Sequence, residues 1–294
     1  MIAAPALVAI SILIVLLSLR RPEFPVRIDE RPDKTDERPL VWWSEISRSG
    51  FGEFTAVRLD LHAVDYALNL LVNPSNNSTN KDANARLESP LAMAQVGGYL
   101  VAVNATSYTL PGKSPEQTES WRTFLPGTNV TLRGVAKPRN QEQIGLGPAA
   151  PSYPVLWQDS NGKVGLTTLR PPENAVWFLS AYHWLIKEHQ VFHAALPYIK
   201  RTNRSAAGIS EDGRWLFLVA CGPSNQKSSK DSGASLPELA EFMLSLGVAN
   251  ALNFDGGSST SMIIKQQKSY LLTPPPEKYI SRPVPVILGI TPNH

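Results

Sequence analysis

Apolar and polar residues alternate along much of the chain with the period of a β-strand. In residues 54–61, Val57, Leu59 and Leu61 fall on one face and Arg58 falls on the other. Side chains of a strand point to its two faces in turn, so this pattern predicts a half-buried strand. Shorter apolar segments follow at 67–72, 99–103, 154–158, 164–169, 206–209, 215–220, 249–254, 262–264 and 284–290. We therefore expect a chain rich in strands.

One segment follows the period of a helix instead. Residues 236–244 place apolar side chains at positions i, i+3, i+4, i+7 and i+8, which is the spacing of one helical face. Ser235 and Glu238 have the spacing of a capping box, and Gly247 stands where a helix commonly ends. One clear helix among many strands predicts an α+β fold, a mixed, strand-rich sheet domain flanked by a few helices.

The first 19 residues carry no charged side chain and are rich in isoleucine, leucine, valine and alanine. Crossing the core of a bilayer takes about 20 apolar residues, so we expect one transmembrane anchor at 1–19. A secretory signal peptide is the alternative, although a basic start and a clear cleavage site before Arg20 are missing. Residues 20–39 are charged and contain proline, and we interpret them as a linker. The folded domain is then expected at 40–294.

Composition and motifs argue against several classes of function. The formal net charge is +3 and the basic residues are spread along the chain, so no nucleic-acid partner is expected. Cys221 is the only cysteine, which excludes a disulfide within the chain and a cysteine zinc site. The five histidines show no HExxH pattern, so no metal site is predicted and the need for a cofactor stays open. No G-x-S-x-G sequence is present, which disfavours a serine hydrolase.

The most informative local feature is a glycine-rich turn behind an expected strand. Asp255 ends that strand, and Gly256 and Gly257 let the backbone approach a ligand closely. Ser258 and Ser259 add hydroxyl groups to backbone amides that can bind an anion. On its own this pattern favours an ordinary tight turn, closed by a hydrogen bond to the Asp255 carboxylate.

Several further motifs occur in order around this turn. They are Ala102-Val103-Asn104-Ala105, Arg204-Ser205-Ala206-Ala207-Gly208-Ile209, Asp212-Gly213-Arg214, the segment 232–240, Ala251-Leu252-Asn253-Phe254-Asp255-Gly256-Gly257-Ser258-Ser259, and Arg282-Pro283-Val284. In this order they resemble the phosphodiester glycosidase family, over most of the chain after Val41. Three places depart from the family pattern. Ser258 replaces a glycine, Ala105 follows Asn104 where glycine is usual, and 220–223 replaces an Asp-Gly-Arg sequence.

The resemblance implies a hydrolase that cleaves a sugar from a glycosyl 1-phosphodiester. The departing phosphomonoester titrates near pH ~6 and is a good leaving group, so acid catalysis is less necessary than in ordinary glycosidases. Asp255 is then the expected base or nucleophile on the sugar side, since its charge repels phosphate. Arg204 is the second expected catalytic residue, and it binds phosphate together with Arg282, because guanidinium pairs bidentately with phosphate oxygens. The other expected substrate-binding residues are Asn104, Gly256, Gly257, Ser258 and Ser259.

The expected partner is a carbohydrate or phosphoglycan in an exported glycan or glycolipid. This favours a membrane-anchored domain outside the cytoplasm, with secretion as the alternative. All Lys and Arg residues follow the apolar N-terminal segment, which by the positive-inside rule favours the cytoplasm instead. The departure at 220–223 keeps a second function open, a non-catalytic phosphoglycan-binding module at the cell surface. An envelope scaffold with neither binding nor turnover is a third.

Overall fold

The computed structural model describes residues 24–33, 35–75, 82–112, 124–145, 153–168, 170–225, 232–274 and 282–293. The apolar segment 1–19 lies outside these residues, so the expected anchor or signal peptide stays a prediction. Within the described ranges, no helix is both long and apolar enough to cross a membrane.

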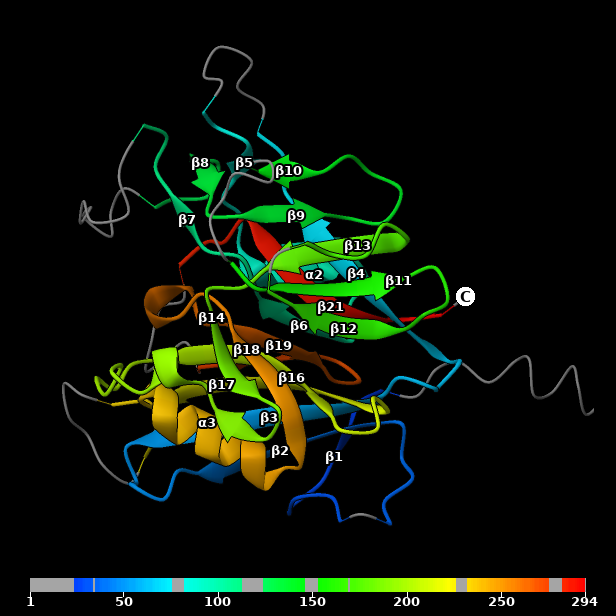
Figure 1. Ribbon diagram of the computed structural model, residues 1–294, viewed down its shortest axis with the longest axis vertical. Helices are drawn as coiled ribbons and strands as arrows, with labels where there is room; N and C mark the ends of the chain where they lie inside the picture. Colours follow the sequence, from blue (N-terminus) through cyan, green and yellow to red (C-terminus); the bar gives the residue numbers. More distant parts are fainter. Residues whose placement is uncertain are drawn as a thin grey trace, which may run out of the picture.

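An eight-stranded sheet forms the lower layer of the molecule in Figure 1. The order of its strands is β1 (Val26–Arg27), β2 (Leu40–Ile46), β3 (Gly52–Asp60), β17 (Trp215–Pro223), β16 (Arg204–Ser210), β18 (Val248–Asn253), β14 (His183–Lys187) and β15 (Gln190–Val191). Strands β1 and β2 run parallel, and the other neighbouring pairs of this sheet are antiparallel. The segment expected as a linker thus contributes an edge strand, and the boundary at residue 40 stays a prediction.

A five-stranded antiparallel sheet packs on one face of the eight-stranded sheet. Its strands lie in the order β20 (Tyr270–Thr273), β19 (Met262–Lys265), β6 (Val101–Asn104), β21 (Val286–Pro292) and β4 (Tyr66–Val72). One buried apolar cluster fills the space between the sheets, where Val57 and Leu218 from one sheet join Val103 and Leu288 from the other. Burying such a side chain stabilises the fold by about 1.5–3 kcal/mol. The two sheets are therefore held in a fixed relation.

Two α-helices in the described part of the chain cover the outer faces of these sheets. Helix α3 (Leu236–Ser245) buries Leu239 and Met243 against the eight-stranded sheet. Helix α2 (Pro90–Val96) buries Met93 against the five-stranded sheet. Helix α2 has only seven residues, too few for a periodic pattern to be seen in the sequence. The predicted strand-rich α+β class is confirmed.

The capping box expected before α3 is present. The Ser235 hydroxyl accepts a 3.2 Å hydrogen bond from the amide of Glu238, whose carboxylate accepts a 2.9 Å bond from the amide of Ser235. The helix ends at Ser245, and Gly247 adopts a φ of 84° just behind it. Local sequence signals thus predicted both ends of this helix correctly.

Strand β3 is covered on both faces, whereas its alternating pattern predicted one exposed face. The side chain of Arg58 is only 5% exposed. Its guanidinium stacks on the ring of Trp215 at 4.0 Å and donates a 2.8 Å hydrogen bond to the carbonyl oxygen of Asp36. The cover over the polar face comes from segments distant in sequence, so the alternation within β3 alone could not predict it.

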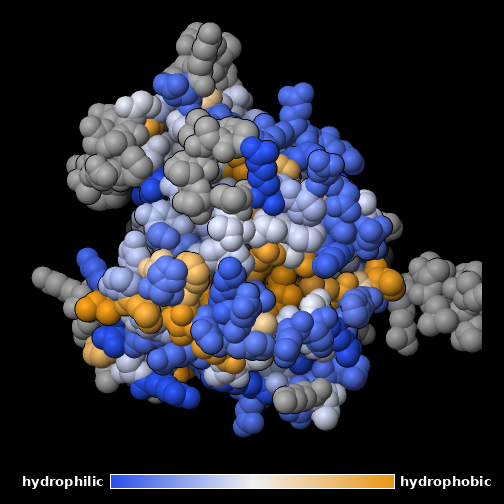
Figure 2. All heavy atoms as spheres, in the orientation of Figure 1, coloured by the Kyte–Doolittle hydropathy of each residue, from blue (hydrophilic) through white to orange (hydrophobic). Residues whose placement is uncertain are grey.

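Two smaller sheets complete the upper part of the view in Figure 1. One is formed by β10 (Ile144–Gly145), β9 (Val135–Lys137), β13 (Ala175–Ser180), β11 (Val155–Asp159) and β12 (Val164–Thr167). The other is formed by β5 (Ala85–Arg86), β8 (Asn129–Leu132) and β7 (Tyr108–Thr109). Figure 2 shows polar residues over most of this side of the molecule, with apolar residues gathered at mid-height where the layers meet.

The described chain enters the eight-stranded sheet at a defined end. Val26 of β1 lies opposite Val41 in a parallel pair, so Phe24 lies near the end of the sheet that contains Leu40. The strand registers place Asn253 level with Ala56 in the middle of β3, and Arg204 level with Phe54 toward its other end. The N-terminal side of the described chain and the Asp255 turn thus lie toward opposite ends of this sheet.

Candidate functional site

Three neighbouring strands bring polar residues to the same end of the eight-stranded sheet. Strand β18 ends at Asn253, and its neighbours β16 and β14 begin at Arg204 and His183. Neighbouring antiparallel strands run in opposite directions, so the last residue of one meets the first residues of the others. Asn253 lies directly opposite His183 in the register. The Asp255 turn follows at this end.

The turn carries the chain from the eight-stranded sheet to β19 of the five-stranded sheet, and it is orange-brown at the left of Figure 1. It contains a short 3-10 helix, η3 (Gly257–Ser259). Gly257 has a φ of 59°, a backbone conformation that favours glycine. A Cβ atom on Gly256 would lie 2.9 Å from the carbonyl oxygen of Asn203 and 3.7 Å from Cδ of Arg204. Glycine here lets the turn pack tightly against the start of β16.

The amides of this turn donate mostly within the protein. The Gly257 amide donates to the carbonyl oxygen of Asn203 at 2.8 Å, and the Gly256 amide donates to the Asp255 carboxylate at 3.1 Å. The Ser259 amide donates to the carbonyl oxygen of Gly256 at 3.2 Å. Contacts to substrate through Gly256, Gly257 and Ser258 stay predictions, whereas the packing role of the two glycines is visible.

Asn104 lies at the centre of this end of the molecule with 0% exposure. Its side-chain nitrogen donates a 2.7 Å hydrogen bond to the carbonyl oxygen of Asp255. Its side-chain oxygen accepts bonds from the Ser205 hydroxyl at 2.6 Å and from the Ser261 amide at 3.0 Å. The amide group of Asn104 is thus engaged with three protein groups. Its expected contact with substrate stays a prediction.

The carboxylate of Asp255 is shielded from solvent and close to positive charge. Its side chain is 19% exposed, and Oδ2 lies 3.9 Å from Nη2 of Arg282. Burial raises the pKa of Asp255, while a hydrogen bond from Ser259 and the charges of Arg282 and Arg133 act in the opposite direction. The net effect is a pKa above the ordinary value. Asp255 therefore keeps its proton to a higher pH than an exposed aspartate.

Arg282 is fixed beside Asp255 by several contacts. Its Nε and Nη2 atoms donate to the Ser259 hydroxyl at 3.2 and 3.1 Å. The guanidinium lies against a pair of aromatic rings that contact each other, 5.0 Å from the centroid of Tyr108 and 4.4 Å from that of Phe124. These contacts limit its rotation, so a cationic group is held in place next to the carboxylate.

Arg204 lies against the turn, but its guanidinium is largely engaged. Nε donates to the carbonyl oxygen of Ala234 at 3.1 Å and Nη2 donates to that of Lys200 at 3.1 Å. Burial lowers the pKa of Arg204. No ion pair joins it to a carboxylate of the described residues. The structure thus brings Asp255, Arg204, Arg282 and Asn104 close to the same turn, and their roles at a site stay predictions.

Three residues at this place were missed by sequence reasoning. Arg133 follows β8, and its charge acts on both Asp255 and His183. The Arg133 guanidinium lies 4.9 Å from the centroid of the Tyr182 ring, which meets the His183 ring edge-on at 4.3 Å. Burial, followed by the charges of Arg133 and Arg204, lowers the pKa of His183. No sequence signal indicated these residues, since Arg133 falls in a segment without periodicity or a motif.

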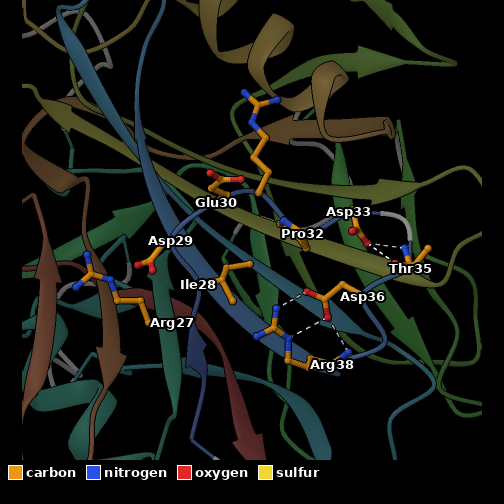
Figure 3. Close-up of a pocket in the computed structure, with 10 residues that line it drawn as sticks. Arg27, Ile28, Asp29, Glu30, Pro32, Asp33, Thr35, Asp36 and Arg38 are labelled. Carbon is orange, nitrogen blue, oxygen red and sulfur yellow. Dashed lines mark hydrogen bonds and ion pairs between the residues drawn. The ribbon is translucent and has the colours of Figure 1, made fainter.

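The described residues around the Asp255 turn offer no metal site, and a surface pocket lies elsewhere in the molecule. Among the described residues, no group of three or more His, Cys, Asp or Glu side chains is placed to hold a metal ion. Figure 3 shows a pocket of about 630 Å³ that is lined by residues between Arg27 and Arg38. In this close-up Arg38 pairs with Asp36 at 2.7 Å. The pocket belongs to the segment around β1, and none of the predicted site residues lines it.

A sequence model of phosphodiester glycosidases matches residues 93–291, which is more than half of the chain. The chain belongs to the phosphodiester glycosidase family. The matched range contains every predicted site residue from Asn104 to Arg282. Membership of this family makes the protein a glycosidase that acts on phosphodiesters.

Two solved structures are similar to this phosphodiester glycosidase. One is the catalytic domain of zebrafish N-acetylglucosamine-1-phosphodiester alpha-N-acetylglucosaminidase, auto-inhibited by its pro-peptide, with 15% identity, a TM-score of 0.58, and coverage of 89% of this chain and 87% of that chain. The other is a hypothetical protein from Synechocystis, with 16% identity, a TM-score of 0.49, and coverage of 87% and 64%. The first likeness shows a shared fold. The comparison with curated proteins gives no match.

Proposed function

We propose that this phosphodiester glycosidase hydrolyses the bond between a sugar and phosphate in a glycosyl 1-phosphodiester of an exported glycan or glycolipid. The observation that carries the proposal is the shielded carboxylate of Asp255, held 3.9 Å from the guanidinium of Arg282. The zebrafish relative, by its name, acts on an N-acetylglucosamine 1-phosphodiester. That name supports the class of bond, and the identity of the sugar is left to experiment.

The chemistry of such a substrate fits these two side chains. When the bond at the anomeric carbon breaks, the departing phosphate gains negative charge, so it needs cations more than a strong acid. Arg282 provides a positioned cation, because Ser259 and two aromatic rings hold it. Asp255 is assigned to the sugar side, as the base toward water or as the nucleophile. In either role it must be ionised.

The remaining expected residues receive supporting roles in this proposal. Asn104 is assigned as a positioning residue, since it bonds the backbone of Asp255 and the neighbouring strand rather than open space. Ser259 orients Arg282, and Gly256 lets the turn pack against β16. Arg204 shapes the wall of the site and adds positive charge to it.

Turnover of defined substrates tests the proposal. Purified protein is incubated with a panel of sugar 1-phosphodiesters, and release of free sugar is measured. Asp255→Asn should abolish release. Tight phosphoglycan binding without any turnover would favour the non-catalytic binding module instead. That alternative is motivated by the departure from the family pattern at 220–223.

The location of the protein is a separate part of the proposal. The uncharged segment 1–19 supports a membrane anchor, and the exported substrate favours a domain outside the cytoplasm, with secretion after cleavage as the alternative. Protease treatment of intact cells should digest the folded domain if it is outside. Protection of the domain in intact cells, with digestion after lysis, would place it in the cytoplasm.

A further inference from the structure

The three arginines near Asp255 differ in how far their donor groups are engaged. Arg282 donates to Ser259 through two nitrogen atoms, and Arg204 donates to two backbone carbonyl oxygens. Among the described residues, the guanidinium of Arg133 contacts only phenol groups, at 3.5 Å from Nη1 to the hydroxyl oxygen of Tyr182 and, more weakly, that of Tyr153. Its Nε atom is buried and has no hydrogen-bond partner among the described residues. Arg133 is thus the arginine with the most donor capacity left for a ligand.

Unpaired buried donors are rare in proteins and call for a physical explanation. More than about 90% of buried polar groups have a partner, and leaving one unpaired costs about 1–3 kcal/mol. Near Arg133, Nε2 of His183 is also buried and unpartnered among the described residues. The polar neighbours of Arg133 are the phenol groups of Tyr153 and Tyr182, and no ion pair joins it to a described carboxylate. A cation in such surroundings is suited to an anionic ligand.

The backbone places Arg133 with some precision. It occupies the turn between β8 and β9, and its amide donates a 2.8 Å hydrogen bond to the carbonyl oxygen of Ser107. The following Gly134 has a φ of 111°, and a Cβ there would lie 2.5 Å from the Cβ of Ser180. The hairpin therefore packs closely against the segment that leads to Tyr182. Packing of this kind fixes the direction of the arginine.

The charges at this end of the molecule do not cancel. Arg133 and Arg282 both act on one carboxylate, that of Asp255, and burial with the charges of Arg133 and Arg204 lowers the pKa of His183, which favours its neutral form. A phosphodiester carries one negative charge, whereas the phosphomonoester product carries about 1.5 to 2 at pH 7. An excess of positive charge therefore stabilises the product-like transition state more than the bound substrate.

We propose that Arg133, together with the hydroxyl group of Tyr182, binds the leaving phosphate of the substrate. This inference rests on the proposed function, and it gives a role to a residue outside the family motifs recognised in the sequence. In the reaction, the bond from the anomeric carbon to the phosphate oxygen breaks and its electron pair stays on that oxygen. Water supplies the new bond to carbon, and its proton passes to Asp255. Arg133 and Arg282 neutralise the charge that develops on the phosphate.

Two substrates with the same sugar test this role. One carries a phosphodiester, and the other carries a neutral nitrophenyl group. Arg133→Met should lower kcat/KM for the phosphodiester by about 10- to 100-fold, the effect of losing hydrogen bonds to a charged group. It should change kcat/KM for the nitrophenyl glycoside by less than about threefold. Equal losses on both substrates would overturn the proposal.

Arg86 provides a matched control. It lies on β5 beside the first residue of β8, whereas Arg133 follows the last one. It also has a buried, unpartnered Nε atom among the described residues and a single 3.5 Å contact, to Asn73. Arg86→Met should leave kcat/KM for both substrates unchanged. Thermal unfolding of both variants, with Arg133→Lys as a milder change, separates loss of function from loss of fold.

Binding of inorganic phosphate gives a readout that does not depend on turnover. Calorimetry on the full protein should detect phosphate binding, weakened about tenfold or more by Arg133→Met and unchanged by Arg86→Met. Equal binding by the wild type and Arg133→Met, or no binding by the wild type, would overturn the subsite. Arg133-dependent phosphate binding in a protein that cleaves no sugar phosphodiester would keep the subsite and reject the proposed function.

Discussion

The side-chain amide of Asn104 donates a 2.7 Å hydrogen bond to the main-chain carbonyl oxygen of Asp255, which lies 151 residues later in the chain. Asn104 ends a strand of the five-stranded sheet, and Asp255 follows a strand of the eight-stranded sheet. The same amide group also bonds Ser205 and Ser261. One fully buried side chain therefore links both sheets to the candidate site.

Replacing Asn104 should cost both stability and turnover. Asn104→Leu keeps the size of the side chain but leaves three buried polar groups without their partner. We expect a loss of about 3 kcal/mol in the free energy of unfolding, measured with urea, because each unpaired buried group costs about 1–3 kcal/mol. The partly buried Asn69 makes one 2.6 Å bond to Thr291, and Asn69→Leu should cost clearly less. Similar losses for both variants would contradict the central role of Asn104.

Substitutions of the two adjacent glycines of the turn should be harmful for different physical reasons. Gly256→Ala brings a Cβ to 2.9 Å from the carbonyl oxygen of Asn203, so it should shift the turn and reduce turnover. Gly257 has a φ of 59°, and a Cβ there would lie 3.9 Å from the hydroxyl oxygen of Thr202, its nearest neighbour. Asparagine tolerates that conformation better than alanine. The turnover rate and the unfolding temperature should therefore be higher for Gly257→Asn than for Gly257→Ala. At Gly256, asparagine should be no better tolerated than alanine.

The pH dependence of turnover should report the raised pKa of Asp255. The ionised carboxylate is required as base or nucleophile, so kcat/KM should fall on the acid side at a pH above about 3.9, the ordinary value for aspartate. The charge of Arg282 lowers this pKa, so Arg282→Met should move the acid limb to a higher pH. The pH at which kcat/KM has fallen by half on the acid side does not depend on the maximal rate of the variant. If this pH is the same in Arg282→Met and the wild type, Arg282 does not lower the pKa of Asp255.

Stability should depend on the same ionisation. The pKa of Asp255 is higher in the folded than in the unfolded chain, so the folded state binds the proton more tightly. The contribution of this group is therefore favourable at low pH and is lost as the pH rises through the folded pKa. Asp255→Asn removes this dependence. From about pH 4 upward, the wild type should lose unfolding free energy relative to Asp255→Asn.

Glu238 should show the opposite dependence. Burial alone would raise its pKa, but hydrogen bonds from Arg201 and from the Ser235 amide lower it to about 2. A depressed folded pKa contributes stability above the unfolded value of 4.5, and this contribution is lost as the pH falls toward 2. Glu238→Gln should therefore be less stable than the wild type at pH 6 and equal to it near pH 2. Turnover at neutral pH should persist in this variant, because Glu238 is a capping residue.

The sequence predicted those parts of the structure that depend on neighbouring residues. The residues of the Ser235–Glu238 capping box are three positions apart, and the glycines of the turn directly follow Asp255. Each motif is therefore visible in a short stretch of sequence. The gathering of Arg204 and Arg282 around that turn followed from the order of motifs and from the family resemblance. Local pattern alone could not place these two arginines.

The rest depends on packing between distant segments. Arg133 and Tyr182 are 49 residues apart and meet only because the β8–β9 turn packs beside the start of β14. The cover over Arg58 likewise comes from Asp36 and Trp215. In both cases the partners belong to different elements, and no periodicity along one element encodes their contact.

Phe24 and the Asp255 turn lie toward opposite ends of the eight-stranded sheet. This placement limits what the candidate site could reach if the chain were anchored through its N-terminal residues. The register places the two at the levels of Asp60 and Phe54 of β3, six residues apart, so they are separated by about 20 Å along the strands. A chain held at a bilayer by residues before Phe24 would carry the Asp255 turn on the side of the sheet away from that attachment. The candidate site would then lie nearer to the surrounding medium or an opposing surface than to the bilayer itself.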